Sequence, residues 1–238
     1  MKNTRDRHVS VGLVIVLLTA GMIFMPDRIV MGADGTEAAQ GIVDRARVTF
    51  SSFMRDSNYS WLHENLDRAR GVLIFPQVIK GGFIWGGSGG TGVLVVRDEK
   101  TDKWGQPAFY TIGSVTFGLQ IGGEAAEVIM VAMTQKAIDS LLSSSFKIGA
   151  DASVALGPVG GGAKANADLP NVTADLISFV KSKGLYAGLN LEGSFVSVRS
   201  SLNQSYYRKD VRPVDIIVKQ GVTNSRAGEL REALKCKC

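Results

Sequence analysis

The sequence predicts an α+β domain built on a strongly curved, glycine-rich antiparallel sheet or small barrel, with an N-terminal amphipathic helix, one inserted helix and C-terminal helices. Three observations predict this fold. Apolar residues recur with helical spacing in residues 41–56, short runs rich in Val, Ile and Phe alternate with glycine clusters from residue 71, and helical spacing returns after Pro213. With 238 residues, 45% hydrophobic and 21% charged, the chain can bury a core, which excludes disordered and collagen-like classes.

The N-terminal segment has the layout of a secretory signal. Three basic residues precede an uncharged apolar run over residues 11–25. The run is short for a transmembrane span, so we expect residues 1–33 to be a signal peptide, with an uncleaved N-terminal anchor as the alternative. The expected location is the periplasm or cell envelope, or the inner membrane if the anchor stays. Residues 34–238 are then expected to form a single domain.

An amphipathic helix is predicted over residues 41–56. Its apolar residues fall on one side at the 100° turn per residue of an α-helix. They are Ile42, Val43, Ala46, Phe50, Phe53 and Met54. In one interpretation this helix caps the domain core; in the other it lies on a membrane, where the phenylalanines insert and the arginines meet lipid phosphate.

Eight segments between residues 71 and 198 have the composition of β-strands separated by Gly, Pro or Asp-Lys turns. Their connections are too short for crossover helices, so antiparallel pairing is expected. The segments are GVLIFP, GGFIWGG, TGVLVVRDE, QPAFYTIG, EVIMVAM, FKIGADASVALGP, ADLISFVKSKG and GLYAGLNLEGSFVSV. Glycine clusters at 81–92, 118–123 and 157–162 are the expected corners of the curved sheet.

Three further segments have helical spacing. TQKAIDSLLSSS predicts the inserted helix, with Thr134 as its N-cap. Near the C-terminus, PVDIIVKQ begins with Pro213 at a first turn, and NSRAGELREALK places Ala227, Leu230 and Leu234 on one side.

Catalytic patterns in the glycine run lack the context that catalysis requires. Ser88 stands in a literal GxSxG, but a strand and not a helix is predicted after it, and His63 precedes it where a hydrolase histidine would follow. The overlapping GxGxxG at 87–92 also leads into a strand, so no helix N-terminus can receive a dinucleotide pyrophosphate. We therefore predict no enzyme, no cofactor and no metal site. Cys236 and Cys238, one residue apart at the C-terminal end, are expected to be an incidental tail.

Positive charge is concentrated at the C-terminal end. Residues 199–238 carry nine basic and four acidic side chains, whereas residues 34–198 carry fourteen and sixteen. Such a tail attracts anionic surfaces. Basic and aromatic residues are interleaved only in QSYYRKD, so nucleic acid is not the expected partner.

Four sequence segments carry a resemblance to a known family. They are the Ile-Phe-Pro with a following Lys-Gly-Gly at 74–82, the Gly-x-Gln-x-Gly at 118–122, Gly-Ala-Asp-Ala-Ser-Val at 149–154, and the Gly-Leu-x-x-Gly-x-x-Leu-Glu-Gly at 184–193. In this combination the chain resembles the SYLF domain family over residues 41–235. It looks like an exported bacterial member.

The resemblance implies a lipid-binding module. Relatives in eukaryotes bind phosphoinositides, fungal ones also bundle actin, and their membrane contact is attributed to an N-terminal amphipathic helix and basic residues. The matching basic positions are Arg45, Arg47, Arg55 and Lys80, and Phe50, Phe53 and Met54 would supply apolar insertion. We expect docking on anionic phospholipid of the cell envelope. The alternatives are an assembly protein that holds an envelope protein partner through its sheet or basic C-terminal helix, and a carrier that encloses one lipid inside the sheet.

Overall fold

The structure is a computed structural model that describes residues 33–82, 85–117, 122–159, 174–183, 191 and 193–235. The apolar run over residues 11–25 and both cysteines lie outside the described residues. The helices are α1 (Ala33–Met54), α2 (Ser60–Asn65), α3 (Gln135–Leu142), α4 (Ser200–Tyr207), α5 (Pro213–Ile217) and α6 (Gly228–Lys235). The strands are β1 (Gly71–Gly82), β2 (Trp85–Val96), β3 (Ala108–Phe117), β4 (Gly122–Ala132), β5 (Ser145–Lys147), β6 (Val154–Leu156), β7 (Leu176–Lys183) and β8 (Phe195–Val198).

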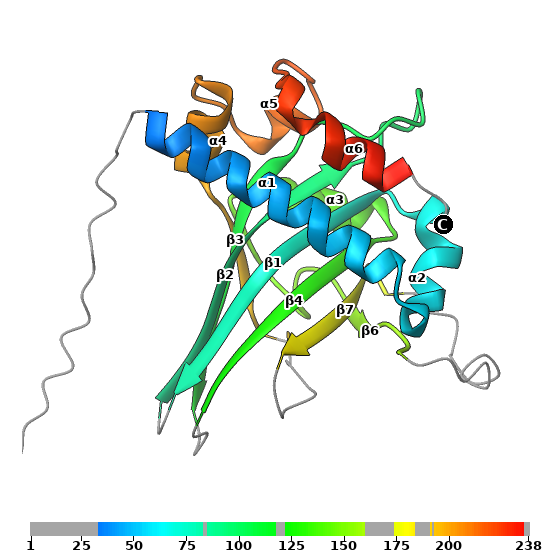
Figure 1. The fold of residues 1–238 in the computed structure, drawn as a ribbon, viewed down its shortest axis with the longest axis vertical. Helices are drawn as coiled ribbons and strands as arrows, with labels where there is room; N and C mark the ends of the chain where they lie inside the picture. Colours follow the sequence, from blue (N-terminus) through cyan, green and yellow to red (C-terminus); the bar gives the residue numbers. More distant parts are fainter. Residues whose placement is uncertain are drawn as a thin grey trace, which may run out of the picture.

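The strands form one sheet in the order β5-β8-β3-β2-β1-β4-β7-β6. All pairs are antiparallel except β6 with β7, which is parallel. The two edge strands β5 and β6 are joined by residues 148–153 alone, and Ile148 bridges Ala152 within that connection. Since six residues span at most about 20 Å, the two edges must approach each other. The predicted α+β fold with a strongly curved sheet is therefore confirmed, and Figure 1 shows the sheet curled beneath α1.

Helices cover the two faces of the sheet differently. On one face, which we call the outer face, α1 runs obliquely across the strands and α2, α4 and α6 pack beside it (Figure 1). The other, inner face packs against α3, α5 and β5. Apolar side chains such as Phe75, Tyr110 and Met130 fill this inner face, so a lipid carried there would have to displace core residues.

The N-terminal helix is longer than the sequence predicted. It was expected from residue 41, but α1 begins at Ala33. The first two turns carry few large apolar residues, so their periodicity is weak, yet tertiary contacts hold them. Ala39 is fully buried, and Thr36 Oγ1 donates a hydrogen bond to the Ser205 carbonyl of α4 at 3.1 Å. Packing, and not intrinsic propensity, therefore fixes where this helix starts.

Local signals place the inserted helix correctly. Thr134 caps α3, because its Oγ1 accepts a hydrogen bond from the Ala137 amide at 3.2 Å. Two predicted strands are wrong. GGFIWGG contains the end of β1 and the start of β2, and FKIGADASVALGP divides into β5 and β6, which lie on opposite edges of the sheet. Gly149, whose φ is 87°, turns the chain between them. None of the helices among the described residues is long and apolar enough to cross a bilayer.

A bulge in β1 explains two of the many glycines. The pairing of β1 with β2 shifts register between Ile74 and Val78, and the displaced β1 backbone lies close to β2. A Cβ atom on Gly92 would lie 2.1 Å from the Ile74 carbonyl oxygen, and one on Gly90 would lie 2.4 Å from that of Gln77. Neither contact can be relieved by a side-chain rotation, so only glycine fits beside the bulge.

A matched pair of glycine variants tests this account. Gly92→Ala should lower the stability by about 1–3 kcal/mol, because the carbonyl it meets belongs to rigid backbone. Gly89→Ala should be neutral or slightly stabilising, since a Cβ there meets nothing closer than 3.9 Å. Thermal unfolding of both variants is the measurement, and equal Tm values would contradict the proposed role of the bulge.

Candidate functional site

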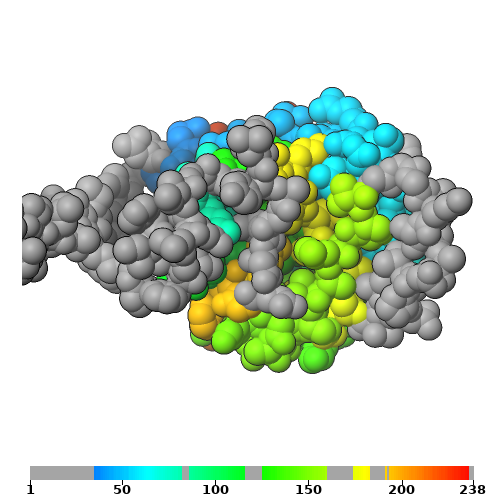
Figure 2. Space-filling view, turned by 90° about the horizontal axis from the view of Figure 1, so that it is seen from below, coloured from blue at the N-terminus to red at the C-terminus, as the bar shows by residue number. Residues whose placement is uncertain are grey.

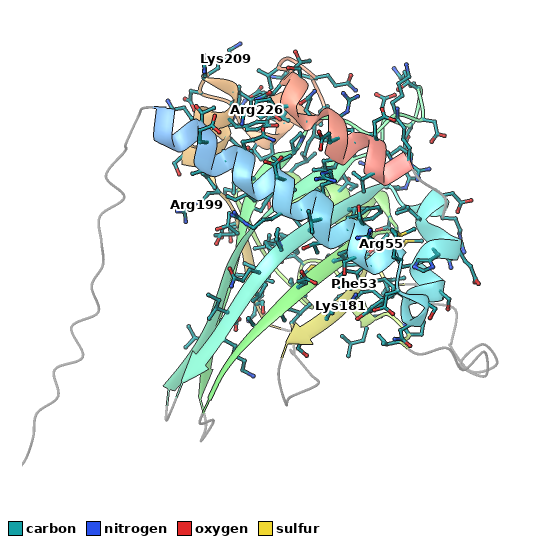
Figure 3. All side chains as sticks on the ribbon, in the orientation of Figure 1. Phe53, Arg55, Lys181, Arg199, Lys209 and Arg226 are labelled. Carbon is teal, nitrogen blue, oxygen red and sulfur yellow. The ribbon has the colours of Figure 1, made fainter. Side chains whose placement is uncertain are left out.

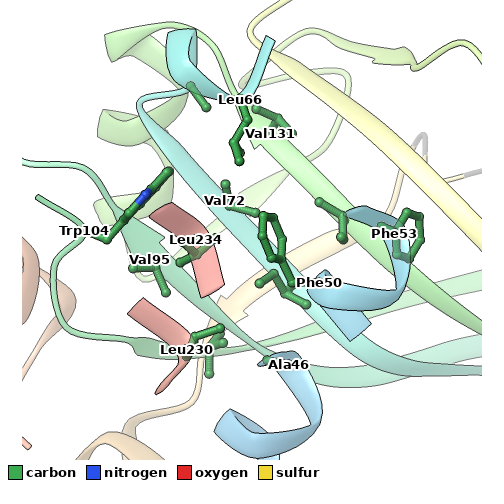
Figure 4. Packing of buried hydrophobic residues seen from close by; sticks show 14 of the residues in the cluster. Ala46, Phe50, Phe53, Leu66, Val72, Val95, Trp104, Val131, Leu230 and Leu234 are labelled. Atoms are coloured by element: carbon green, nitrogen blue, oxygen red, sulfur yellow. The ribbon is translucent and has the colours of Figure 1, made fainter. Parts of the chain in front are cut away.

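The apolar side of α1 faces the sheet and not the solvent. Phe50 and Phe53 are 0% exposed and Met54 is 3% exposed. They pack with residues of β1, β4, α2 and α6 in one cluster (Figure 4), and the Phe53 ring lies 4.5 Å from that of Tyr59. The prediction that these three side chains insert into a membrane is therefore wrong for this conformation, since the core already buries them. The alternative interpretation, in which the helix caps the core, is confirmed.

The three arginines of α1 and its C-terminal end are in two different situations. Arg47 Nε lies 3.2 Å from Glu229 Oε2 of α6, so this arginine ties two helices together. Arg45 and Arg55 are exposed, and within the described part of the chain neither has an ion-pair partner. Figure 3 labels Arg55 at the C-terminal end of α1. Two of the three predicted arginines thus remain available to an external anion.

Lys80 is not brought together with these arginines. It follows Val78 by two residues on β1, and Val78 belongs to the cluster on the inner face. Residues two apart in a strand share a face. Lys80 therefore lies on the inner side of the sheet, where its register partner on β2 is Ser88. The predicted basic set is divided between the two faces.

Lys181 of β7 is a cation that the sequence analysis did not single out. Its Nζ lies 2.9 Å from Asp56 Oδ2, 3.2 Å from Ser52 Oγ and 4.9 Å from the centre of the Phe53 ring (Figure 3). Hydrogen bonds from Lys181 and from the Asn58 amide lower the pKa of Asp56. A positive charge at a helix C-terminus is stabilising, so Lys181 fastens the end of α1 to the sheet. The sequence did carry a signal for this position, because Lys181 follows the buried Phe179 by two residues on β7 and therefore shares its face of the sheet.

A groove of about 380 Å³ separates the middle of α1 from the sheet. It is lined by Asp44, Arg45, Val48, Thr49, Pro76, Gln77, Ala125, Ala126 and Glu127. The carboxylates already have donors: Gln40 Nε2 lies 2.7 Å from Asp44 Oδ1, and Thr49 Oγ1 lies 3.3 Å from Glu127 Oε1. Arg45 is the one cation among these lining residues, and the apolar part of the lining comes from Val48, Pro76, Ala125 and Ala126.

The catalytic patterns of the glycine run have no partners for catalysis among the described residues. Ser88 Oγ shares a hydrogen bond of 2.7 Å with Ser114 Oγ of the neighbouring strand. His63 is engaged elsewhere, with Nε2 at 3.0 Å from the Phe53 carbonyl. No group of three His, Cys, Asp or Glu residues that could hold a metal ion occurs in the described ranges.

Much of the C-terminal basic charge is paired. Arg226 makes a bidentate contact with Glu37 of α1, at 2.7 and 3.0 Å. Asp215 accepts from both Arg212 and Lys219, and these bonds lower its pKa to about 2. The basic residues Arg212, Lys219 and Arg226 of the C-terminal segment therefore form ion pairs within the domain and are not a free basic tail.

These observations define an α+β domain with a curled sheet and a helix, α1, laid across its outer face, with the exposed Arg45 on that helix and the exposed Arg55 directly after it. Comparison with known proteins then identifies the family. A family model described as "Las17-binding protein actin regulator" (Ysc84) matches residues 113–237. The chain belongs to this family, whose domain is also called SYLF, and the family membership that the sequence resemblance predicted is confirmed.

Individual relatives are eukaryotic and longer. The human SH3 domain-containing YSC84-like protein 1 is 31% identical over 168 residues, which is 70% of this chain and 48% of the relative. LAS seventeen-binding protein 3 of Saccharomyces cerevisiae is 33% identical over 144 residues, which is 60% of this chain and 31% of the relative. The chain thus spans about half or less of the relatives it matches. No solved structure matches it.

Proposed function

We propose that the chain is a non-enzymatic domain that docks on anionic phospholipid surfaces through the exposed side of α1. One observation carries this proposal: the exposed Arg45 and Arg55 lie on either side of Val48, which is 52% exposed. Arg55 directly follows α1, and its amide still donates to the Ser51 carbonyl at 3.2 Å, so the helical turn extends to it. Positions 45, 48 and 55 fall within about 80° of each other at 100° per residue. A basic residue near an anionic membrane contributes about 1 kcal/mol. Asp44 on the same side weakens the attraction, so the binding should be modest and sensitive to salt.

Charge reversal on α1 tests the proposal. Arg45→Glu combined with Arg55→Glu should weaken co-sedimentation with phosphatidylglycerol-containing liposomes by at least about tenfold, because two attractive charges become repulsive. The wild-type chain should bind less when salt rises from about 0.1 M to about 1 M, since the Debye length falls from about 10 Å to about 3 Å. Liposomes of phosphatidylcholine alone should bind weakly.

The matched control reverses two lysines that lie outside α1. Lys100 and Lys103 are exposed in the turn between β2 and β3. Lys100→Glu with Lys103→Glu changes the net charge by the same amount, and it should reduce binding much less. Equal losses in the two double variants would show that only net charge matters and would reject the α1 surface.

We also propose export, on the basis of the apolar run at 11–25 and the basic residues before it. An envelope location would present bacterial anionic phospholipid to the domain. Cell fractionation, with mass determination of the mature chain, tests both the location and the cleavage.

A protein partner is the second candidate function, because relatives bear names such as LAS seventeen-binding protein 3. The exposed apolar residue near the basic C-terminal helices is Val218, at 58%. Ile216, Leu230 and Leu234 are each 1% exposed and belong to the core. Deleting residues 221–238 would therefore damage the fold, and Val218→Glu is the cleaner variant for crosslinking.

A further inference from the structure

Three large apolar side chains are exposed near one end of the long strands. Ile79 of β1 is 57% exposed, Val115 of β3 is 84% exposed and Phe195 of β8 is 52% exposed. We call these three residues the strand-end patch. Strands β1 to β4 extend past the helices at this end, toward the lower left of Figure 1, and Figure 2 views the molecule from that side.

Register places the patch on the outer face of the sheet, which α1 covers further along the strands. Ile79 pairs with Gly89, Gly89 pairs with Gly113, and Gly113 pairs with Phe195. Directly opposed residues in antiparallel strands point to the same face. Val115 follows Gly113 by two residues on β3 and so shares that face.

Gly89 and Gly113 lie between these side chains, so only backbone is present there. The fold does not require glycine at either position. A Cβ atom on Gly89 or Gly113 would meet nothing closer than 3.7 Å. This contrasts with Gly90 and Gly92, where the β1 bulge leaves no room for a side chain. No side chain at Gly89 or Gly113 covers the space between Ile79, Val115 and Phe195. Several large apolar side chains exposed on one face indicate contact with a partner or a membrane.

Cations border the patch. Lys147 Nζ lies 5.6 Å from the centre of the Phe195 ring, while the nearby Asp151 carboxylate accepts from the Lys147 amide at 2.7 Å. On the other side, Ile79 pairs with Ala125, which lines the same groove as Arg45. Apolar side chains flanked by lysine and arginine match the boundary between the hydrocarbon and headgroups of an anionic bilayer.

A stable protein interface buries at least about 1,200 Å² in total, far more than three separated side chains supply. A lipid surface therefore fits the strand-end patch better than a protein partner does.

We infer that the strand-end patch is a membrane-insertion surface, which enters the interface of an anionic phospholipid bilayer while Arg45 and Lys147 contact the headgroups. This inference rests on the proposed function and deepens it. It assigns the apolar part of membrane binding to Ile79, Val115 and Phe195 of the sheet, because Phe50, Phe53 and Met54 are held in the core.

The test removes apolar surface without changing charge. Ile79→Thr, Val115→Thr and Phe195→Thr are combined, since threonine suits a strand. Vesicles of phosphatidylcholine with phosphatidylglycerol are used at low and high salt, and insertion is followed by the surface-pressure rise of a monolayer of the same lipids. Binding at about 1 M salt, where charge attraction is screened, should fall at least about tenfold, and the pressure rise should disappear. Low-salt binding should persist at reduced affinity.

The matched control replaces three residues of comparable exposure elsewhere. Leu156, Val159 and Val218 are 70%, 59% and 58% exposed. The triple variant with threonine at these positions should keep both the high-salt vesicle binding and the pressure rise of the monolayer. Val115→Thr alone, at the most exposed position, should lower high-salt binding about threefold and keeps the test valid if the triple variant does not fold.

The outcomes separate the two proposals. If the wild-type chain binds anionic vesicles, Arg45→Glu with Arg55→Glu loses binding and the patch variants do not, the insertion surface is overturned while the proposed function stands. If the wild-type chain binds no vesicle, both are overturned. Equal losses in the patch and control triples would also overturn the assignment to the strand ends.

Discussion

The Phe50→Ala variant should unfold at a Tm roughly 10 °C below that of the wild-type chain. Phe50 is 0% exposed and packs between α1 and the outer face of the sheet. Truncating a buried phenylalanine costs about 3–5 kcal/mol, because transfer free energy is lost and a cavity remains. For a domain of this size each kcal/mol corresponds to about 2–4 °C in Tm. Thermal unfolding followed by circular dichroism is the measurement.

Val48→Ala on the same helix is the matched control. Val48 is 52% exposed, so its truncation should shift the Tm by only a degree or two. Liposome binding measured well below the Tm should survive in Phe50→Ala, because Arg45 and Arg55 are unchanged. An unaltered Tm together with lost binding would instead show that α1 turns its apolar side toward the lipid, which would restore the insertion hypothesis for Phe50.

The apolar periodicity of α1 could be predicted from the sequence, but the surface that it covers could not. A stripe containing Phe50, Phe53 and Met54 has the same spacing whether it faces a sheet or a bilayer. The distinction depends on residues far away in the chain, such as Leu230 and Leu234 of α6, which complete the cluster. The amphipathic pattern therefore predicted the helix but could not show whether its apolar side packs on a sheet or on a bilayer.

Basic residues show the same limit. Arg47 and Arg55 are eight positions apart in the sequence, yet one is paired with Glu229 of α6 and the other is exposed. Lys80 was grouped with them because it follows the Ile-Phe-Pro segment. The bulge in β1 shifts the register between Ile74 and Val78, and so determines which face the later residues of that strand occupy. A single extra residue reverses the side on which a charge lies.

The sequence analysis did not single out the strand-end patch, because the glycines of this region were interpreted through the curvature of the sheet. The glycine clusters were interpreted as corners of the sheet, which accounts for Gly90 and Gly92 beside the bulge. It does not account for Gly89 and Gly113, where a side chain would fit. Only the positions of neighbouring atoms separate these two kinds of glycine, since in the sequence they look alike.

Asp175→Ala should destabilise the domain by about 3 kcal/mol, which corresponds to roughly 10 °C in Tm. Asp175 is 7% exposed and joins α3 to the edge of the sheet. Its Oδ1 accepts from Thr134 Oγ1 at 2.8 Å, and its Oδ2 accepts from Ser153 Oγ at 2.8 Å and from Lys136 Nζ at 3.1 Å. Removing the carboxylate leaves the hydroxyl of Thr134 and both donors of Ser153 without their acceptor, whereas Lys136 is mostly exposed and regains water.

The pH dependence of this effect has a definite sign. Burial alone would raise the pKa of Asp175, but hydrogen bonds from Thr134, Ser153 and Lys136 outweigh burial and hold that pKa well below its ordinary value. A carboxyl whose pKa is lower in the folded than in the unfolded state stabilises the fold above its unfolded pKa of about 3.9. That stabilisation is lost as the pH falls further, through the folded pKa.

Asp175→Asn isolates the charge, because the amide keeps the shape of the side chain and cannot ionise. The Tm difference between the wild-type chain and Asp175→Asn should be constant from about pH 8 to about pH 5 and should narrow below about pH 4. Asp215→Asn is the less buried comparison, with a side chain that is 25% exposed, and its cost should be smaller because ion pairs near the surface contribute little. A difference for Asp175→Asn that grows on acidification would mean that the carboxyl is protonated in the folded state, which is incompatible with the donors that surround it.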